Sequence, residues 1–261
     1  MIIDNATAIS YMKKDMEYFY YDIVDIKYMQ KKPAVFADTP EKLLEHDFVI
    51  VKPYDGEVYV CVYTENADLI SEAVSFARET GIPDIVISAE KGADITFLGE
   101  NISPEVSQKG KHFGIFGAIE RPDQINASAD ISISAPTQSD IDAIAALPPK
   151  EWAFLPQRIK FIKNILIAKK DGALMGYLVY DSVSDGHYDI IMLYTHTNAR
   201  RKGTASALVK AFAEECMIKN GVPYYVCAAS EASARLALSL GIPQMRAETV
   251  IYKLKQGENN G

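Results

Sequence analysis

The sequence predicts an α/β protein in which a mixed, mostly antiparallel sheet is flanked by helices, and it predicts that this fold occurs twice. In the second half, strand and helix patterns follow the order β-α-ββ-β-α-β-α-β. The two halves also correspond: VYVCVYTEN, a helix and GIPDIV in the first are matched by DIIMLYTHTN, a helix and GVPYYV in the second. Helix–Gly–x–Pro–strand is a common pattern, so coincidence is the alternative to duplication.

In the first half, apolar residues recur at spacings of three and four over residues 6–30, which predicts one long helix. DFVIVKPYDGEVYVCVYTE predicts a hairpin, ADLISEAVSFARET a helix that ends at Gly81, and DIVISA a strand. Residues 99–130 look irregular. Their three glycines in GKHFGIFG fit no nucleotide-binding spacing, so a connector or a short strand is expected.

The second half begins with ADISISAPTQSDIDAIAAL, which predicts a strand, a cap at Thr137 or Ser139, and a helix. Asp171–Gly172 joins two strands in a hairpin, and HYDIIMLYT is the next strand. After two more helices and the strand PYYVCAA, the segment ETVIYKL is expected to be the last strand of this half. We therefore expect an N-terminal domain over residues 1–125 and a C-terminal domain over residues 130–255.

The composition narrows the class of protein. The chain has 261 residues, of which 48% are hydrophobic and 24% charged, and no apolar run approaches the roughly 20 residues that cross a bilayer. The N-terminus lacks the basic start and apolar core of a signal peptide, so we expect a cytoplasmic protein. Its three scattered cysteines predict neither a disulfide framework nor a metal site.

The net charge of −8 is unevenly distributed. Residues 1–130 carry 12 Lys and Arg against 23 Asp and Glu, whereas residues 131–261 carry 15 against 12. The acidic half would repel nucleic acid and anionic lipid, so we expect neither a nucleic-acid nor a membrane partner. The basic half suits a compact anion, and the asymmetry favours two domains.

The stretch NARRKGTASALVKAF, residues 198–212, carries the pattern most closely tied to chemistry. A strand ending at Tyr194 precedes it, and a strongly periodic helix opens at Ala205. The first turn of a helix offers unpartnered backbone N–H groups and a partial positive charge, which together bind phosphate. Gly203 and Ala205 are small enough to let a phosphate approach. A solvated surface turn is the alternative.

This stretch resembles the Arg/Gln-x-x-Gly-x-Gly/Ala signature of the GCN5-related N-acetyltransferases (GNAT), with Arg200, Gly203 and Ala205 at its fixed places. The strand order of residues 130–255 is similar to that of the superfamily. SEASARLALSLGI resembles its Asn-x-x-(Ala/Ser)-x-x-x-Tyr-x-x-x-Gly-Phe segment. Larger members carry a degenerate N-terminal half before a working one, and this chain is similar.

The resemblance implies acetyl-CoA, with coenzyme A as its product, and a small-molecule amine that attacks the thioester directly. Backbone N–H groups of about residues 201–206 would hold the diphosphate, and the strand at residues 193–195 would separate from its neighbour to pair with pantetheine. Asp189 would be the catalytic base, in competition with a role as a strand-edge carboxylate. The implied cofactor-binding residues are Leu193, Tyr194, Thr195, Arg200, Arg201, Lys202, Gly203, Thr204, Ala205, Ser206, Ser230 and Ser233.

Two positions depart from the family pattern. Ser230 stands where Asn is usual, and Ala237 stands where a Tyr often serves as general acid. Ala237 cannot donate a proton, so another group does, or the thiolate leaves unassisted, or the domain binds coenzyme A without catalysis. His196, Cys227 and the loop around Trp152 are weaker candidates, for which an incidental or packing role is the alternative.

Three other functions compete with the acetyltransferase. The first is an acyl-CoA-binding sensor without activity. The second is a tandem-domain transferase that uses aminoacyl-tRNA, against which the acidic half argues because a tRNA surface needs an extended basic face. The third is a protein in which the basic stretch is only a surface turn. The oligomeric state stays open, with a homodimer as one alternative.

Overall fold

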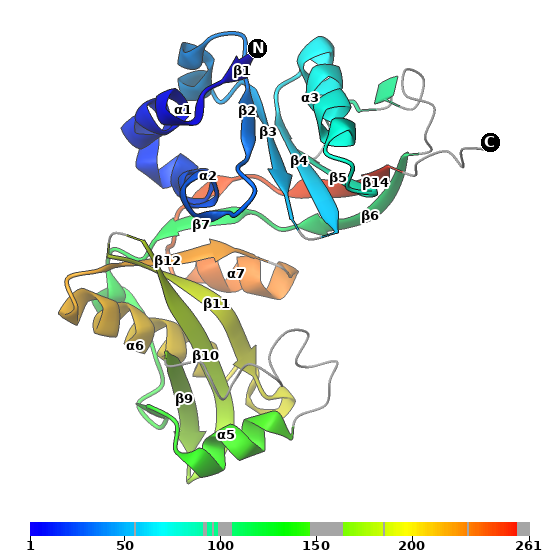
Figure 1. The fold of residues 1–261 in the computed structure, drawn as a ribbon. Coiled ribbons are helices and arrows are strands. Elements are labelled where there is room, and N and C mark those ends of the chain that lie inside the picture. Colours follow the sequence, from blue (N-terminus) through cyan, green and yellow to red (C-terminus); the bar gives the residue numbers. More distant parts are fainter. Residues whose placement is uncertain are drawn as a thin grey trace. The chain divides into compact units, whose positions relative to one another are not determined.

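The computed structural model describes residues 1–261 except 55, 91–92, 96, 99–105, 147–163, 185, 229 and 255–261. The chain divides into two compact units, each built on its own sheet (Figure 1). Unit 1 comprises Met1–Ile115, Cys227–Glu231 and Gln244–Gly261, and unit 2 comprises Phe116–Val226 and Ala232–Pro243. Within the described part of the chain, no helix has the length and apolar character needed to cross a membrane.

Within the described residues, the first sheet has seven strands in the order β1-β2-β3-β4-β5-β14-β6, of which β4 and β5 are parallel and the other neighbours antiparallel. Its strands are β1 (Ile2–Ile3), β2 (Ala34–Phe36), β3 (Phe48–Pro53), β4 (Glu57–Tyr63), β5 (Asp84–Glu90), β6 (Val106–His112) and β14 (Thr249–Leu254). The helices of this unit are α1 (Asn5–Met12), η1 (Lys13–Asp15), α2 (Met16–Tyr28), η2 (Pro40–Glu45) and α3 (Ala67–Glu79).

Helices cover both faces of the first sheet. Val49 and Val51 of β3 pack with α3 on one face, whereas Phe48 and Ile50 pack with α1 and α2 on the other. Because side chains alternate along a strand, this arrangement buries β3 from both sides and explains its continuous apolar run.

The single helix expected over residues 6–30 is wrong: the chain forms α1, the short 3-10 helix η1 and then α2. Asp15 leaves the helical region, with φ −131°, and its carboxylate accepts a hydrogen bond from the backbone N–H of Tyr18. A residue that caps a new helix in this way interrupts an apolar stripe without changing its spacing. The apolar spacing therefore continues across the break, and periodicity alone does not reveal where one helix ends and the next begins.

The second sheet has seven strands in the order β13-β7-β12-β11-β10-β9-β8, with β11 and β12 parallel. Its strands are β7 (Ile115–Ala118), β8 (Ser132–Ser134), β9 (Ile165–Lys170), β10 (Ala173–Ser184), β11 (His187–Thr195), β12 (Val222–Cys227) and β13 (Gln244–Arg246). The helices of this half are η3 (Pro122–Gln124), α5 (Gln138–Ala145), η6 (Thr197–Ala199), α6 (Thr204–Ile218) and α7 (Glu231–Ser239).

Helices α5 and α6 pack on opposite faces of the second sheet. Ile144 of α5 shares a buried cluster with Tyr177 and Tyr194, whereas the ring of Tyr180 contacts Phe212 of α6 at a centroid distance of 5.1 Å. The predicted hairpin at Asp171–Gly172 joins β9 and β10, and both of its residues have positive φ, as a type I′ turn requires.

The last strand differs from the sequence-based expectation. ETVIYKL was assigned to the C-terminal half, but β14 lies in the first sheet, between β5 and β6 (Figure 1). Conversely, β7 follows β6 along the chain and pairs in the second sheet. Each sheet is thus completed by a strand from the other half of the sequence. A period-2 pattern predicts a strand but does not identify its partner, which explains the error.

Candidate acyl-CoA site

Strand β11 contains a bulge just before its last four residues. Val179 of β10 is opposite Met192, but the next residue, Tyr180, is opposite Ile190, so Ile191 is the extra residue. Ile191 is 57% exposed. A bulge of this kind bends the strand and increases its twist, which turns its end away from a regular neighbour.

Beyond the bulge, β11 and β12 separate. The two strands pair in parallel only from His187↔Val222 to Asp189↔Tyr224, and among the described residues Ile190–Thr195 have no pairing partner on β12. On the other side, β11 stays paired with β10 as far as Thr195. The sequence-based expectation that this strand would separate from its neighbour agrees with this register.

The backbone groups of this part of β11 that point away from β10 can be identified. The N–H of His196 donates to the carbonyl oxygen of Met175 at 2.9 Å, and in an antiparallel ladder such bonds occur at every second residue. The N–H and C=O groups of Leu193 and Thr195 therefore point away from β10. Tyr194 differs, because its backbone faces Tyr177 and its side chain is buried in the core.

The start of α6 is open. Its N-cap is Gly203, with φ +81°, and no side chain of the described residues caps the helix. Among the residues that the structure describes, no acceptor faces the backbone N–H groups of Ala205 and Ser206. Thr204 is buried, and its hydroxyl donates to Ala199 O at 3.3 Å. Gly203 has a left-handed backbone conformation and no side chain, so it leaves these N–H groups accessible.

The corresponding helix of unit 1, α3, has a start that is capped by a side chain. The N-cap of α3 is Asn66, whose side-chain oxygen accepts hydrogen bonds from the N–H groups of Asp68 and Leu69, at 3.1 and 3.2 Å. Strands β4 and β5 also stay paired from Glu57↔Asp84 to Val62↔Ala89. One chain therefore contains a closed and an open version of the same strand–turn–helix element.

The basic residues of the turn lie next to the open strand edge. The Nε of Arg200 donates to the carbonyl oxygen of Thr195 at 3.4 Å, which places this guanidinium beside β11. Arg201, which has φ +61°, and Lys202 are exposed. A Cβ added to Gly203 would lie 3.3 Å from that of Ser128, so the residue 126–131 segment also touches this turn.

Asp189 occupies the point at which β11 and β12 diverge. It is the last residue of β11 paired with β12, and only 4% of it is exposed. The ring of its neighbour Tyr188 contacts Tyr180, on the face that α6 covers. Because side chains alternate along a strand, the Asp189 side chain lies on the α5 face.

The remaining candidates are dispersed. Ser230 is exposed just before α7, and Ala237 is fully buried within it. Ser233 interacts with Tyr225 of β12, whose hydroxyl lies 3.0 Å from the Ser233 hydroxyl and 3.1 Å from its carbonyl oxygen. Sequence reasoning missed Tyr225, because nothing in a strand pattern indicates which helix its hydroxyl reaches.

Of the three weaker candidates, only His196 has a side chain that the structure describes. His196 caps η6, where its Nδ1 accepts a hydrogen bond from the N–H of Asn198 at 3.4 Å. This is a structural role. The side chain of Cys227 and the segment containing Trp152 lie outside the described residues.

Comparison with known proteins agrees with this geometry. Residues 136–242 match the model of the acetyltransferase (GNAT) family. Among solved structures, the chain is similar to a Drosophila protein, with 13% identity, 97% of each chain covered and a TM-score of 0.57. It is also similar to a GCN5-related N-acetyltransferase from Sphaerobacter thermophilus, with 10% identity, 98% and 95% of the chains covered and a TM-score of 0.54.

A tandem GNAT protein from the clavulanic acid biosynthesis pathway also aligns over 99% of each chain, with 10% identity and a TM-score of 0.51. No curated protein sequence matches the chain. At these identities the structural likeness shows the fold, and it extends over both halves. Residues 136–242 therefore match the acetyltransferase (GNAT) family, and the chain as a whole has the fold of a two-domain, tandem GNAT structure.

Proposed function

We propose that this protein is an acetyl-CoA-dependent N-acetyltransferase that acts on a small-molecule amine. The observation that carries the proposal is the open start of α6 beside the edge of β11 that β12 leaves unpaired, in contrast to the capped start of α3 in unit 1. The N–H groups of residues 201–206 would hold the diphosphate, and Arg200, Arg201 and Lys202 would add charge-assisted contacts. Acetyl-CoA supplies the activated acetyl group.

The residues of β11 would bind and orient the thioester arm. The backbone N–H and C=O groups of Leu193 and the N–H of Thr195 would pair with pantetheine as a neighbouring strand would, because they point away from β10. A backbone N–H of this edge would also polarise the thioester carbonyl, which becomes more negative as the amine attacks. Tyr194 would contribute packing alone.

Asp189 is the proposed base. The amine nitrogen bonds to the carbonyl carbon, the carbon–sulfur bond breaks, and the proton lost by the nitrogen passes to Asp189 directly or through water. The electron pair of the broken bond leaves with the sulfur. Ala237 cannot protonate that thiolate, so in this proposal the thiolate leaves unassisted or another group protonates it.

The substitution Ala205→Asp tests the phosphate site without harming the helix. A carboxylate in the first turn favours a helix start, and α3 already carries Asp68 at the equivalent second position. Beside a bound diphosphate the same carboxylate would cost about 2 kcal/mol or more, which is a roughly 30-fold loss of affinity. Calorimetric titration with coenzyme A measures it, with Ala205→Ser as the matched control. Equal affinity in both variants would contradict the proposal.

A second candidate is a coenzyme A-binding sensor without turnover, which the buried Ala237 favours. Both candidates predict coenzyme A binding, so activity separates them. Thiol release from acetyl-CoA with a panel of primary amines, suppressed in Asp189→Asn, supports the enzyme. Tight binding with no release above the amine-free rate supports the sensor. A cytoplasmic location and a homodimer stay predictions, which fractionation and light scattering test.

A further inference from the structure

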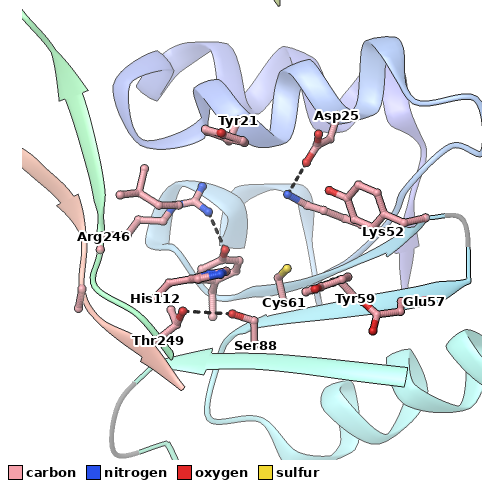
Figure 2. A pocket seen from close by; sticks show the side chains of 15 residues that line it. Tyr21, Asp25, Lys52, Glu57, Tyr59, Cys61, Ser88, His112, Arg246 and Thr249 are labelled. Carbon is pink, nitrogen blue, oxygen red and sulfur yellow. Dashed lines mark hydrogen bonds and ion pairs between the residues drawn. The ribbon is translucent and has the colours of Figure 1, made fainter. Parts of the chain in front are cut away.

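A cavity of about 430 Å³ lies within unit 1, and the proposed transferase does not use it. It is bounded by α2 and by the face of the first sheet that α2 covers (Figure 2). Figure 2 shows Asp25, Lys52, Tyr59 and Glu57 on one side of the cavity and Arg246 on the other. Its size falls in the range of small-molecule sites.

The cavity is not a second version of the coenzyme A site. The N–H groups of Asp68 and Leu69, at the start of α3, donate to the side chain of Asn66. Strand β4 is paired with β5 as far as Val62. The two features that would hold a diphosphate and pantetheine in unit 2 are therefore absent from α3 and β4, so an occupant of this cavity has a different chemistry.

The charged side chains around the cavity leave one negative charge in excess. The Nζ of Lys52 lies 2.8 Å from Asp22 and 2.7 Å from Asp25, and Arg246 bonds to Asp22. These two cations and two carboxylates cancel. Glu57 also lines the cavity and adds a third carboxylate. Among the described residues that line the cavity or bond to its wall, the charges therefore favour a single positive charge in the occupant.

The charge of Asp25 is only partly compensated by Lys52. Burial raises the pKa of Asp25, and the contact with Lys52 does not outweigh burial, so this pKa stays above its usual value. Burial also raises the pKa of Asp22, but Arg246 and Lys52 outweigh it and bring that pKa below its usual value. Asp25 bonds to Lys52 through Oδ2, and within the described residues no donor reaches its Oδ1. A cation beside that oxygen would stabilise the ionised carboxylate.

Among the described residues, the other titratable side chains of the wall supply no positive charge near pH 7. Burial lowers the pKa of His112 from its usual value, so its ring is mainly neutral at that pH. Burial raises the pKa of Cys61 to about 11, so its thiol is neutral as well. The positive charge that would complement Asp25 and Glu57 is therefore not part of the wall itself.

Two tyrosine rings stand beside these carboxylates. Tyr54 and Tyr59 both line the cavity, with ring centroids 5.4 Å apart and ring planes at 83°. Burial raises the pKa of both hydroxyls, and the next largest contribution comes from the charge of Asp25 at Tyr54 and from that of Glu57 at Tyr59. Each ring therefore has a carboxylate close by. Within the described part of the chain, no Lys or Arg lies over either ring, and the face of an aromatic ring attracts a cation.

We propose that this cavity binds an organic ammonium ion, which donates a hydrogen bond to Asp25 Oδ1 and lies against the rings of Tyr54 and Tyr59. The excess negative charge selects a monocation, the unpaired carboxylate oxygen accepts one of its N–H groups, and the rings attract its charge. The site does not depend on the proposed coenzyme A site, so its failure would leave the transferase proposal untouched.

The test uses three probes of similar size and different charge: benzylamine, which is a monocation at pH 7, uncharged benzyl alcohol, and the anion benzoate. Calorimetric titration into the full-length protein, without acetyl-CoA, measures each affinity. Benzylamine should bind saturably and benzyl alcohol at least about tenfold more weakly. Benzoate should show no binding, because it brings a further negative charge to Asp25. Equal affinities of benzylamine and benzyl alcohol would overturn the proposal.

A second measurement distinguishes this cavity from an amine site in unit 2. The carboxyl carbon signal of Asp25 is followed by NMR over a pH series, with and without saturating benzylamine. A bound cation favours the ionised carboxylate, so the pKa of Asp25 should fall on binding. An unchanged titration of Asp25 in a protein saturated with benzylamine would contradict the proposed site.

Tyr54→Leu removes one ring, and Tyr54→Phe is its matched control, which keeps the ring and loses only the hydroxyl. Tyr54 is 42% exposed, so both variants should fold. The first should weaken benzylamine about fivefold, and the second should retain its affinity. Asp25→Asn should reduce the affinity for benzylamine to that for benzyl alcohol, and the Tyr54 pair decides if this variant does not fold. An unchanged benzylamine affinity in Tyr54→Leu overturns the proposal.

Discussion

At the scale of single residues, the two halves of the chain differ at the N-caps of α3 and α6. Asn66 and Gly203 occupy the same position of the same element, and one closes the helix start while the other leaves it open. The two N-caps differ by the side-chain carboxamide of Asn66, which Gly203 lacks. A side chain that caps a helix and a ligand that binds to it compete for the same N–H groups.

Replacing Asn66 by Ala should therefore affect stability and leave ligand binding alone. The N–H groups of Asp68 and Leu69 lose their acceptor, which we expect to lower the free energy of unfolding by about 1 kcal/mol. Urea denaturation measures this loss. Coenzyme A affinity should stay unchanged, and a drop in affinity comparable with that of Ala205→Asp would show that unit 1 contributes to the same site.

Residue-scale reasoning from the sequence succeeds where the chemistry is local. Gly203, Ala205 and the basic residues are contiguous, and the strand before them is strongly patterned, so the turn was predictable. The cluster around Arg246 was not, because Asp22 and Arg246 are 224 residues apart. No spacing rule connects two charges that only a folded sheet brings together.

At the scale of elements, one carboxylate, that of Asp140, both caps α5 and links this helix to the second sheet. Asp140 accepts hydrogen bonds from the N–H and hydroxyl of Thr137, at 2.9 and 2.6 Å, and lies 2.7 Å from the Nζ of Lys169 on β9. Burial raises the pKa of Asp140, but these partners outweigh it and bring the pKa to about 2. The carboxylate is thus stabilised in its ionised form.

This shift predicts a pH dependence. The pKa of Asp140 in the folded state lies below the value of about 3.9 that an unfolded chain gives. Its contribution is therefore complete above about pH 4 and is lost as the pH falls towards 2. Asp140→Asn should lower the free energy of unfolding by about 1–2 kcal/mol at pH 7.

The control for this experiment is Asp142→Asn, which removes an exposed carboxylate from the same helix. Thermal unfolding between pH 2 and pH 7 should show the Asp140 variant converging with the wild type at the acid end. A constant gap over the whole range would contradict the assigned role of this carboxylate.

Strand β11 marks the limit of prediction at this scale. The strand itself follows from the sequence, and the GNAT resemblance implied its separation from β12. The bulge at Ile191 was not predictable, because an extra residue leaves an apolar strand pattern nearly unchanged. The bulge nevertheless decides which face Asp189 occupies, so the geometry of the proposed base depends on a feature that only the fold reveals.

At the scale of the whole molecule, the exchange of strands couples the two halves of the sequence. Fragment 1–125 lacks β14, which pairs with β5 and β6 at once. Without it, both strands keep unpaired edges, and we expect this fragment not to fold. Residues 1–115 fused through a flexible linker to residues 244–261 should fold. Thermal melting compares them, and a cooperative transition for fragment 1–125 alone would contradict the coupling.

The central claim is that the open start of α6, and not that of α3, holds the diphosphate. Hydrogen exchange of backbone amides with and without coenzyme A tests it most directly. The account predicts slower exchange at residues 201–206, Leu193 and Thr195 on binding, with Asp68 and Leu69 unchanged. Unchanged exchange at residues 201–206 in a protein saturated with coenzyme A would contradict it.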